Sequence, residues 1–329
     1  MKALIYTGPG TLDFRETPDP LPADGHHLVR IASVGICGSD MHAFLGHDDR
    51  RPAPLILGHE GAGVISGGPM DGQRVTINPL VTCGVCPACR SGRDNLCETR
   101  QIISMPPRDG AFAQYVAMPE RNLVPVPDGF ALDKAALAEP LAVSWHAVRL
   151  GLAALADDRR NRALVIGGGA IGVAAALALT AQGIADVTLV EPNALRRQFL
   201  VREAGFEVVK PDQLEAQLFD VVIDAVGYEA TRATASAHTR PGGVIVHVGL
   251  GSGAGGLDIR RITLQEIAFI GTYTYTAEDF RETVAAMIDG RLGSLDWFET
   301  RPLSDGAQAF ADIRSGAVAA PKIVLTPWA

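Results

Sequence analysis

The chain has 329 residues, of which 47% are hydrophobic and 20% are charged, and its formal net charge is −8. This length and composition are typical of a soluble α/β protein with two domains, and they exclude a fibrous or disordered protein. The negative charge is spread without blocks of like charge, so no nucleic-acid partner is expected. The most apolar window, residues 172–184, is shorter than the ~20 residues of a membrane-spanning helix. The amino-terminal stretch has neither a basic n-region nor an apolar h-region, which predicts a cytoplasmic protein.

The amino-terminal part predicts a compact β domain. Its short alternating apolar runs, 2–6, 27–37 and 113–118, are separated by Pro and Gly and indicate small antiparallel strands. The pattern changes to helical spacing over 133–155, and a charged loop is expected at 157–162. We therefore predict a first domain over residues 1–145.

Strands and helices then alternate, which predicts a doubly wound parallel sheet with helices on both faces. The expected order of elements is strand 163–166, helix 170–183, strand 187–191, helix 193–205, strand 220–226, a helix from 229, strands 242–250 and 267–273, and helix 277–290. We assign this second domain to residues 146–289. The last segment, 290–329, is too short for a domain, so we expect it to return to the first one.

A glycine-rich turn follows the first of these strands. Gly167, Gly169 and Gly172 form a G-x-G-x-x-G that leads into a helix, where a tight turn and free amide groups suit a pyrophosphate. The next strand ends in Glu191, where a carboxylate can accept hydrogen bonds from the adenosine ribose. The pattern predicts a dinucleotide site, with these residues of the turn as its first contacts: Gly167, Gly169, Ala170, Ile171 and Gly172.

The identity of the dinucleotide follows from charge. Glu191 would repel the 2′-phosphate of NADP, so NAD is expected. Arg196 and Arg197 leave NADP open, because a basic residue just past the strand can receive that phosphate instead.

Four of the five cysteines lie in one polar loop. Cys83, Cys86, Cys89 and Cys97 are spaced C-x2-C-x2-C-x7-C. Such spacing lets four thiolates meet one zinc ion at ~2.3 Å and close a tetrahedron, as in a structural site. An iron–sulfur cluster is the alternative, although the loop lacks the usual C-x3-C-P ending. Disulfides fit poorly with an odd number of cysteines, so zinc is favoured.

The fifth cysteine, Cys37, and a histidine, His59, each follow an apolar run that resembles a strand. A Cys and a His on separate strand ends, with acids in place of a third sulfur, would suit a catalytic zinc with an open position. The spacing alone equally allows a small buried Cys and an unrelated His.

Five motifs now taken together resemble the zinc-dependent medium-chain alcohol dehydrogenases, and most closely their sorbitol or polyol branch. These motifs are "CGSDMH", "GHEGAG", the four-cysteine loop, "LAEPLAVSWHAV" and "VIGGGAIG", and they extend over nearly the whole chain. The resemblance implies a GroES-like β-rich catalytic domain, a Rossmann domain and a carboxyl-terminal return. It also implies a homodimer or homotetramer formed through the edge strand at 267–273.

The resemblance also implies roles at the catalytic zinc. Cys37 and His59 are then ligands, with Glu60 and Glu139 as candidate acids, of which one binds zinc directly and the other acts through water. Asp40 would orient the ring of His59 as a carboxylate behind the ligand. Ser39 would contact the substrate oxygen, and His42 would be the outer end of a proton relay.

Further positions carried over by the resemblance border the cofactor and the substrate. Backbone at Val226, Val248 and Thr272 is expected beside the nicotinamide. Lys322 matches a basic position that can reach the pyrophosphate, but a lone lysine near a terminus is more often a solvated surface charge. Phe44, Leu45 and Phe112 are candidate pocket residues that could equally belong to the core.

The implied activity is hydride transfer between a secondary alcohol and NAD, with a polyol or sugar-derived alcohol as substrate. A small alcohol, a diol or L-threonine is the alternative substrate within the same chemistry. A non-catalytic scaffold is the alternative class; it would be expected to lose zinc ligands, and all of them are present in this sequence.

Overall fold

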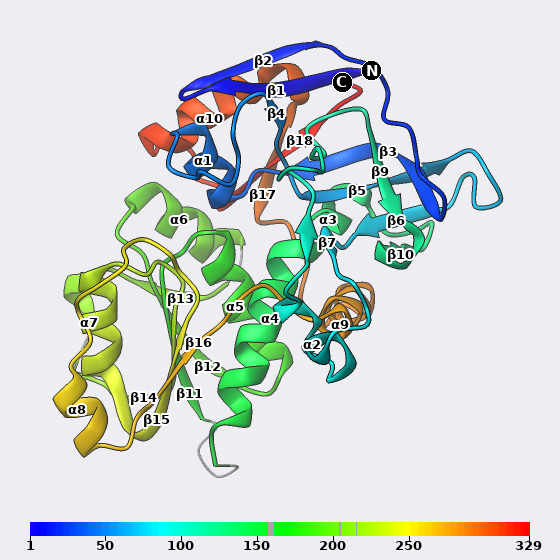
Figure 1. The fold of residues 1–329 in the computed structure, drawn as a ribbon. Helices are drawn as coiled ribbons and strands as arrows, with labels where there is room; N and C mark the ends of the chain where they lie inside the picture. Colours follow the sequence, from blue (N-terminus) through cyan, green and yellow to red (C-terminus); the bar gives the residue numbers. More distant parts are fainter. Residues whose placement is uncertain (157–160, 204, 215) are drawn as a thin grey trace.

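The computed structural model describes residues 1–329 except 157–160, 204 and 215, and Figure 1 shows its two main parts. Most of the charged loop expected at 157–162, and one position of the helix expected at 193–205, therefore lie outside the described residues. Both chain termini lie on the β-rich part, drawn at the top of Figure 1.

The first part is built from short, mainly antiparallel strands, as the alternating sequence predicts. β3 is its central strand and pairs antiparallel with β5, β9 and β18. Smaller sheets, β2-β1-β4 and β7-β8, complete it. The strands are β1 (Lys2–Gly8), β2 (Thr11–Glu16), β3 (His26–Gly35), β4 (Leu55–Ile56), β5 (Glu60–Ser66), β6 (Arg74–Ile77), β7 (Leu80–Val81), β8 (Gln101–Ile102), β9 (Tyr115–Pro119) and β10 (Leu123–Pro125).

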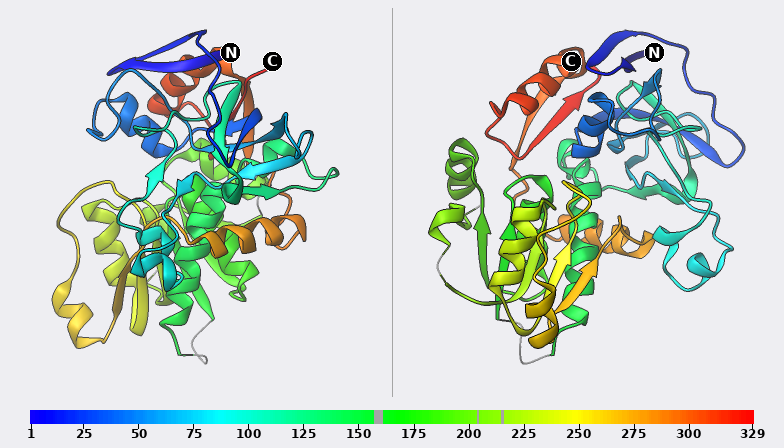
Figure 2. Two further views of the ribbon diagram at one scale, coloured as in Figure 1. Left: turned by 45° about the vertical axis from the view of Figure 1, so that its right-hand side comes forward. Right: turned by 60° about the vertical axis from the view of Figure 1, so that its left-hand side comes forward.

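The second part is a six-stranded parallel sheet in the order β13-β12-β11-β14-β15-β16. The chain starts in the middle of the sheet and builds outward in both directions, which is the expected doubly wound arrangement. Figure 2 shows this sheet between its covering helices. The strands are β11 (Arg162–Ile166), β12 (Asp186–Val190), β13 (Glu207–Val209), β14 (Phe219–Asp224), β15 (Thr239–His247) and β16 (Ala268–Gly271).

Side chains of the parallel strands alternate between two apolar cores. Val165 and its equivalents on neighbouring strands pack with residues of α4, α5 and α9, whereas Leu164 and Ile166 pack toward α7 and α8. Both faces are therefore buried, which explains why these strands are continuous Val, Ile and Leu runs. The helices are α1 (Gly38–Phe44), α2 (Pro87–Arg90), α3 (Leu132–Ala135), α4 (Ala138–Ala153), α5 (Ala170–Ala181), α6 (Ala194–Glu203), α7 (Glu229–His238), α8 (Ile259–Leu264), α9 (Ala277–Ile288) and α10 (Gly306–Ser315).

The helical spacing over 133–155 corresponds to two helices, α3 and α4, and not to one. Pro140 lies in the first turn of α4. A proline has no amide hydrogen and its ring clashes with the carbonyl four residues earlier, so it is tolerated in a first turn but not in a helix interior. α4 then continues past residue 145 and packs against both α9 and β5.

The end of the chain returns to the first part. β17 (Phe298–Pro302) and β18 (Lys322–Thr326) are parallel to each other, and β18 pairs with the end of β3. This pairing places Lys322 next to the Cys37 segment, since the Ile36 amide donates to the Ile323 carbonyl at 3.0 Å. Among the described residues, we find no helix with the length and apolarity that crossing a membrane requires.

Candidate functional site

Register between β3 and β5 brings together a cysteine, a histidine and a glutamate. Gly35, the last residue of β3, pairs with Glu60, the first residue of β5. Cys37 follows β3 by two residues and caps α1, and His59 directly precedes β5. Ligand atoms of Cys37, His59 and Glu60 all lie within 4.8 Å of one another. We refer to these three residues as the mixed cluster.

Asp40 anchors this cluster from α1. Its side chain accepts hydrogen bonds from the Cys37 amide at 3.0 Å and the Gly58 amide at 3.2 Å, and Oδ1 lies 3.4 Å from His59 Nδ1. Burial opposes ionisation of Asp40, but His59 and Arg51 outweigh it and lower the pKa of Asp40. The carboxylate therefore fixes the backbone on both sides of the cluster and faces the histidine ring, as expected for the residue that orients it.

Negative charge dominates the cluster. Burial lowers the pKa of His59, but the charges of Asp40 and Cys37 outweigh burial and hold that pKa well above its usual value. Asp40 and Cys37 therefore favour a positive charge on the imidazole. A divalent cation on a thiolate, an imidazole and a carboxylate would meet the same demand.

Glu60 is held by a buried ammonium group. Lys322 Nζ lies 2.6 Å from both carboxylate oxygens of Glu60 and donates to the Ile36 carbonyl at 2.8 Å. Lys322 is 4% exposed and Glu60 is fully buried. A Cβ atom on Gly35 would lie 2.0 Å from Glu60 Oε2, so this strand end needs glycine to leave room for the carboxylate. The structure corrects the expectation for Lys322, which is bound to Glu60 and is neither on the surface nor free to reach a pyrophosphate.

Glu139 approaches the cluster from the first turn of α4. It is 7% exposed, and its Oε1 accepts a hydrogen bond from Tyr275 Oη at 3.1 Å. Burial raises the pKa of Glu139 to about 7, against the opposing effects of His59 and this hydrogen bond. Of the two acids that the sequence left open, Glu60 lies within ligand distance of Cys37 and His59, while Glu139 is outside that trio.

Ser39 and His42 lie on α1, one turn apart and next to Cys37. Arg51 is buried and donates to the Ser39 carbonyl at 3.0 Å, while its Nη2 lies 3.4 Å from Ser39 Oγ. His42 is exposed, and its ring lies 6.5 Å from that of His47. The helix therefore carries a part-buried hydroxyl two residues after Cys37 and an imidazole at the solvent, which is the order that a proton relay requires.

The four cysteines of the loop 83–97, which we call the cysteine lobe, also converge. Sulfur atoms lie 3.5 Å apart for Cys86 and Cys89, 3.6 Å for Cys83 and Cys97, and 3.9 Å for Cys83 and Cys89. A tetrahedron with Zn–S bonds of ~2.3 Å has sulfur atoms ~3.8 Å apart. The five cysteines of the chain are free of disulfides. The spacing of the sulfur atoms therefore fits a four-thiolate zinc site.

The glycine turn lies at the carboxyl end of β11. Gly167 has φ +102°, and a Cβ atom at Gly172 would lie 1.7 Å from the Gly167 carbonyl oxygen, so both positions need glycine. Glu191 is held behind this turn because it accepts from the Gly168 amide at 2.8 Å and the Asn193 amide at 2.7 Å. The turn with its free helix terminus at Gly169, Ala170 and Ile171 is a cradle that fits a pyrophosphate.

The nicotinamide-side positions follow the carboxyl ends of three adjacent strands. Val226 follows β14, Val248 follows β15 and Thr272 follows β16, so all three lie at the same edge of the sheet. The Thr272 hydroxyl is buried and has no hydrogen-bond partner among the described residues. An unsatisfied buried hydroxyl at this edge fits a polar ligand group.

Arg196 is held by backbone carbonyl groups of the carboxyl-terminal segment. Its guanidinium donates to the carbonyls of Val318 and Ala320 at 3.1 and 3.3 Å, and burial lowers its pKa. Arg197 donates to the carbonyls of Glu191 and Pro192. Both guanidinium groups are therefore engaged with backbone.

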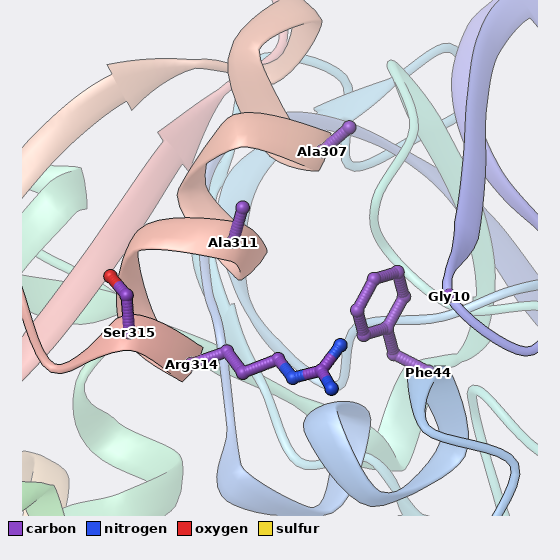
Figure 3. A pocket seen from close by; sticks show the side chains of 6 residues that line it. All are labelled: Gly10, Phe44, Ala307, Ala311, Arg314 and Ser315. Carbon is purple, nitrogen blue, oxygen red and sulfur yellow. The ribbon is translucent and has the colours of Figure 1, made fainter.

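A hollow of about 460 Å³ lies between α10, the end of α1 and the β1–β2 turn, and no residue of the mixed cluster lines it. Figure 3 shows six residues that line this hollow. Phe44 lines it, and the Arg314 side chain points across it toward the Phe44 ring. Phe44 and Phe112 both pack on Phe310, with ring centroids 5.2 and 6.1 Å away. Phe112 is fully buried, so of the two roles weighed for these phenylalanines the packing favours the core.

Comparison with known proteins decides the family. The model of the alcohol dehydrogenase GroES-like domain matches residues 23–128, and that of the zinc-binding dehydrogenases matches residues 170–289. L-galactonate-5-dehydrogenase of Escherichia coli (strain K12) is 35% identical over 308 residues, which cover 89% of this chain and 88% of that protein. The chain belongs to the zinc-binding alcohol dehydrogenase family.

Solved structures of this family match the whole chain. L-idonate 5-dehydrogenase of Escherichia coli K-12 MG1655 has a TM-score of 0.86 and 26% identity, covering 99% of this chain and 97% of that one. Acetophenone reductase of Geotrichum candidum NBRC 4597, solved with NAD, has the same values. A zinc-binding dehydrogenase of Sinorhizobium meliloti 1021, solved with NADP, has a TM-score of 0.87 and 26% identity, with 99% of each chain covered.

The expected family and fold class are confirmed: a GroES-like domain joined to a doubly wound parallel sheet. The ligand, relay and cofactor roles of individual residues stay predictions, to which the geometry above gives a structural basis.

Sequence reasoning missed two residues of this site and misplaced a third. Tyr275, the partner of Glu139, comes from the segment after β16, and Arg51, the partner of Ser39, comes from a loop. Neither lies in a motif, and long-range contacts of this kind leave no local pattern. A signal did exist for Lys322, since it opens an apolar strand at a position where a lysine is unusual.

Proposed function

We propose that this protein is a zinc-dependent, NAD-linked dehydrogenase that oxidises a secondary alcohol of a polyol or a sugar acid. The observation that carries the proposal is the convergence of Cys37, His59 and Glu60 within 4.8 Å. Three protein ligands are the number that catalytic zinc sites use when they leave a position for substrate. The domain boundaries at 145/146 and 289/290 belong to the same proposal.

Zinc held by these three side chains would supply a Lewis acid for the substrate hydroxyl, and NAD on the glycine turn would supply the hydride acceptor. The chain's own residues do the rest. Asp40 holds the ring of His59 and the backbone of Cys37 in place. Ser39 takes the proton from the substrate hydroxyl, and His42, exposed on the same helix, passes it to solvent.

Two features support NAD over NADP. Glu191 is fixed at the end of β12, where its carboxylate disfavours a 2′-phosphate. Arg196 is tied to carbonyls of the carboxyl-terminal return, so it is not free to receive that phosphate. Replacing Glu191 with Ser should therefore reduce the preference for NAD, as measured by the ratio of kcat/KM for NAD and NADP; an unchanged ratio would place ribose recognition elsewhere.

The substrate class is supported by relatives. The proteins named L-galactonate-5-dehydrogenase and L-idonate 5-dehydrogenase act, by their names, on sugar acids. We therefore propose sugar acids and polyols as the substrates of this chain. The runner-up substrates are small alcohols, diols and L-threonine.

We also propose a homodimer or homotetramer in the cytoplasm. β16 is one of the two edge strands of the parallel sheet, and Phe269 on it is 39% exposed, which suits pairing of this edge with a second copy. Free cysteines gathered as thiolate ligands fit a reducing compartment.

The test is a panel of polyols, sugar acids and simple alcohols assayed for NADH formation, with zinc counted on the same preparation. We expect two zinc ions per chain and highest kcat/KM with a polyol or sugar acid. Highest kcat/KM with ethanol or L-threonine would favour the runner-up. One or no zinc per chain, with no NADH formed, would favour a scaffold protein.

A further inference from the structure

We propose that the cysteine lobe is a strut that holds Tyr275 against Glu139, and that Asp94 and Asn95 of this lobe are positioning residues for the reaction. The proposal rests on the dehydrogenase function proposed above. It assigns the lobe a task in the geometry of the active site in addition to stabilising its own loop.

Two side chains of the lobe hold a segment of the Rossmann domain through hydrogen bonds, and we call these two contacts the grips. Asp94, in the short 3₁₀ turn Asp94–Leu96, accepts from the Ala277 amide with both carboxylate oxygens at 3.2 Å. Asn95, 4% exposed, donates to the Tyr273 carbonyl at 2.8 Å. Figure 1 shows the lobe around α2 next to α9, which begins at Ala277. These contacts join distant parts of the chain, since Asn95 and Tyr273 are 178 positions apart and Asp94 and Ala277 are 183 positions apart.

Tyr275 is the middle one of the three residues between the two grips. It is 1% exposed and packs on Phe280 with ring centroids 5.5 Å apart. Its hydroxyl donates to Glu139 Oε1 at 3.1 Å. With positions 273 and 277 fixed on the lobe, the segment leaves Tyr275 little freedom to move its hydroxyl away from Glu139.

The metal site and the grip belong to one short loop. Asp94 and Asn95 lie three and two residues before Cys97, and the Cys97 amide donates to the Asp94 carbonyl at 3.0 Å. Any ion that gathers the four sulfurs therefore also shapes the turn that presents Asp94 and Asn95. The Asp94 carboxylate moreover faces the amino terminus of α9, where the helix dipole favours a negative charge.

The chemistry of the two side chains allows matched variants. In D94N the amide oxygen can still accept from Ala277, whereas D94A removes the acceptor. In N95D the carboxylate keeps the shape of the side chain but loses the N–H that donates to Tyr273. E98A, at an exposed acid that directly follows the lobe and takes part in neither grip, is the control.

The first measurement is hydrogen exchange of the segment 273–280 in the zinc-loaded protein. We expect the Ala277 amide to exchange at least about tenfold faster in D94A, and to stay near the wild-type rate in D94N and E98A. Zinc content should stay at two per chain in all of these variants. Unchanged exchange in both D94A and N95D would overturn the strut.

The second measurement is a double-variant cycle with Y275F, read as kcat and KM. D94A and N95D should each lower kcat by about tenfold with little change in the KM for NAD, because small displacements at a reacting centre slow the chemical step. Combined with Y275F they should add little further loss, and D94N should restore kcat. Fully additive losses, or unchanged kcat in D94A and N95D, would refute a positioning role.

The two measurements separate this inference from the proposed function. If no alcohol of the panel is oxidised, the dehydrogenase proposal fails whatever the exchange rates are. If an alcohol is oxidised but hydrogen exchange at 273–280 is the same in D94A and N95D as in the wild type, the proposed role of the lobe is wrong and the dehydrogenase function remains supported.

Discussion

The cysteine lobe and the mixed cluster collect metal ligands by opposite means. The lobe draws all four sulfurs from residues 83–97, in a loop whose sulfur-bearing residues are mostly part-exposed. The mixed cluster lies at the ends of β3 and β5, and its Glu60 pairs with Lys322, 262 positions away; His59, Glu60 and Lys322 are buried, while Cys37 is part-exposed. Strand register and a buried ion pair shape the mixed cluster. The cysteine lobe is shaped by its own turns, by the hydrogen bonds of Asp94 and Asn95, and by any ion that its four sulfurs bind.

This difference has a consequence for what each metal does. Loss of an ion from the mixed cluster should remove chemistry and leave a folded protein, because the sheet still holds the side chains. An ion lost from the cysteine lobe should loosen structure first. The predictions below test this contrast, from the largest expected effect to the smallest.

Replacing Cys37 with Ala should produce the largest loss. We expect kcat to fall by at least about 10³-fold, since a Lewis acid at the reacting hydroxyl contributes several kcal/mol to transition-state stabilisation. Zinc should fall from two to one per chain, and the melting temperature should stay close to that of the wild type. A kcat within tenfold of wild type would contradict the role of Cys37 as a zinc ligand. It would also contradict the proposed difference between the mixed cluster and the cysteine lobe.

Replacing Lys322 with Met tests the ion pair that shapes the mixed cluster. Burial opposes the charged form of Lys322, but Glu60 and Cys37 outweigh it and raise the pKa of the lysine. Without the ammonium, Glu60 becomes an unpaired buried carboxylate, which destabilises by about 3–5 kcal/mol. Urea unfolding of chelator-treated protein measures this loss.

Two further variants check that interpretation of Lys322. The double variant K322M/E60Q should recover much of the stability, because it removes both charges together. K210M, on an exposed lysine, should stay within about 0.5 kcal/mol of wild type. A K322M protein as stable as K210M would mean that strand register alone shapes the cluster.

The same contrast explains what the sequence could predict. The cysteine lobe is local, so its spacing alone indicates a metal site. The glycine turn is equally local, and the parallel sheet follows from the alternation of Val-rich strands with helices. For the mixed cluster, spacing alone equally allows Cys37 and His59 to be an unrelated buried cysteine and histidine. Only the resemblance to the family identifies them as candidate zinc ligands.

Contacts that depend on strand register or on distant segments could not be predicted from the sequence. The choice between Glu60 and Glu139 depends on the pairing of Gly35 with Glu60, which no local pattern gives. The position of Lys322 depends on β18 joining the end of β3. Tyr275 reaches Glu139 only because the chain brings α4 and the segment after β16 together.

Replacing Cys89 with Ala should have a smaller and different effect from C37A. With one sulfur lost, the lobe should release its zinc, and a loss of about 2 kcal/mol would lower the melting temperature by roughly 4–8 °C. We expect kcat to fall only about tenfold, because loosening of the lobe displaces a group of the active site without removing the catalytic zinc. An unchanged melting temperature together with one zinc per chain would show that the lobe does not need its metal to stay folded.

The smallest effect concerns cysteine reactivity within the lobe after a chelator has removed zinc. Amides of Val85 and Cys86 lower the pKa of Cys83 to about 6, whereas burial raises the pKa of Cys89 to about 12. A lowered thiol pKa means that the reactive thiolate is present above that pKa and is lost as the pH falls through it. Alkylation of Cys83 by iodoacetamide should therefore rise between about pH 5 and pH 7 and then level off.

At pH 7, Cys83 should react at least about tenfold faster than Cys89 in the folded, chelated protein, as peptide mass spectrometry would show. Unfolding in urea should make the two rates similar, because the amides of Val85 and Cys86 then no longer stabilise the thiolate. Zinc should protect both, since a metal-bound thiolate is not free to attack. Equal rates in the folded, chelated protein would mean that the turns of the lobe do not persist without the ion, so that the metal alone, and not the loop, gives this region its shape.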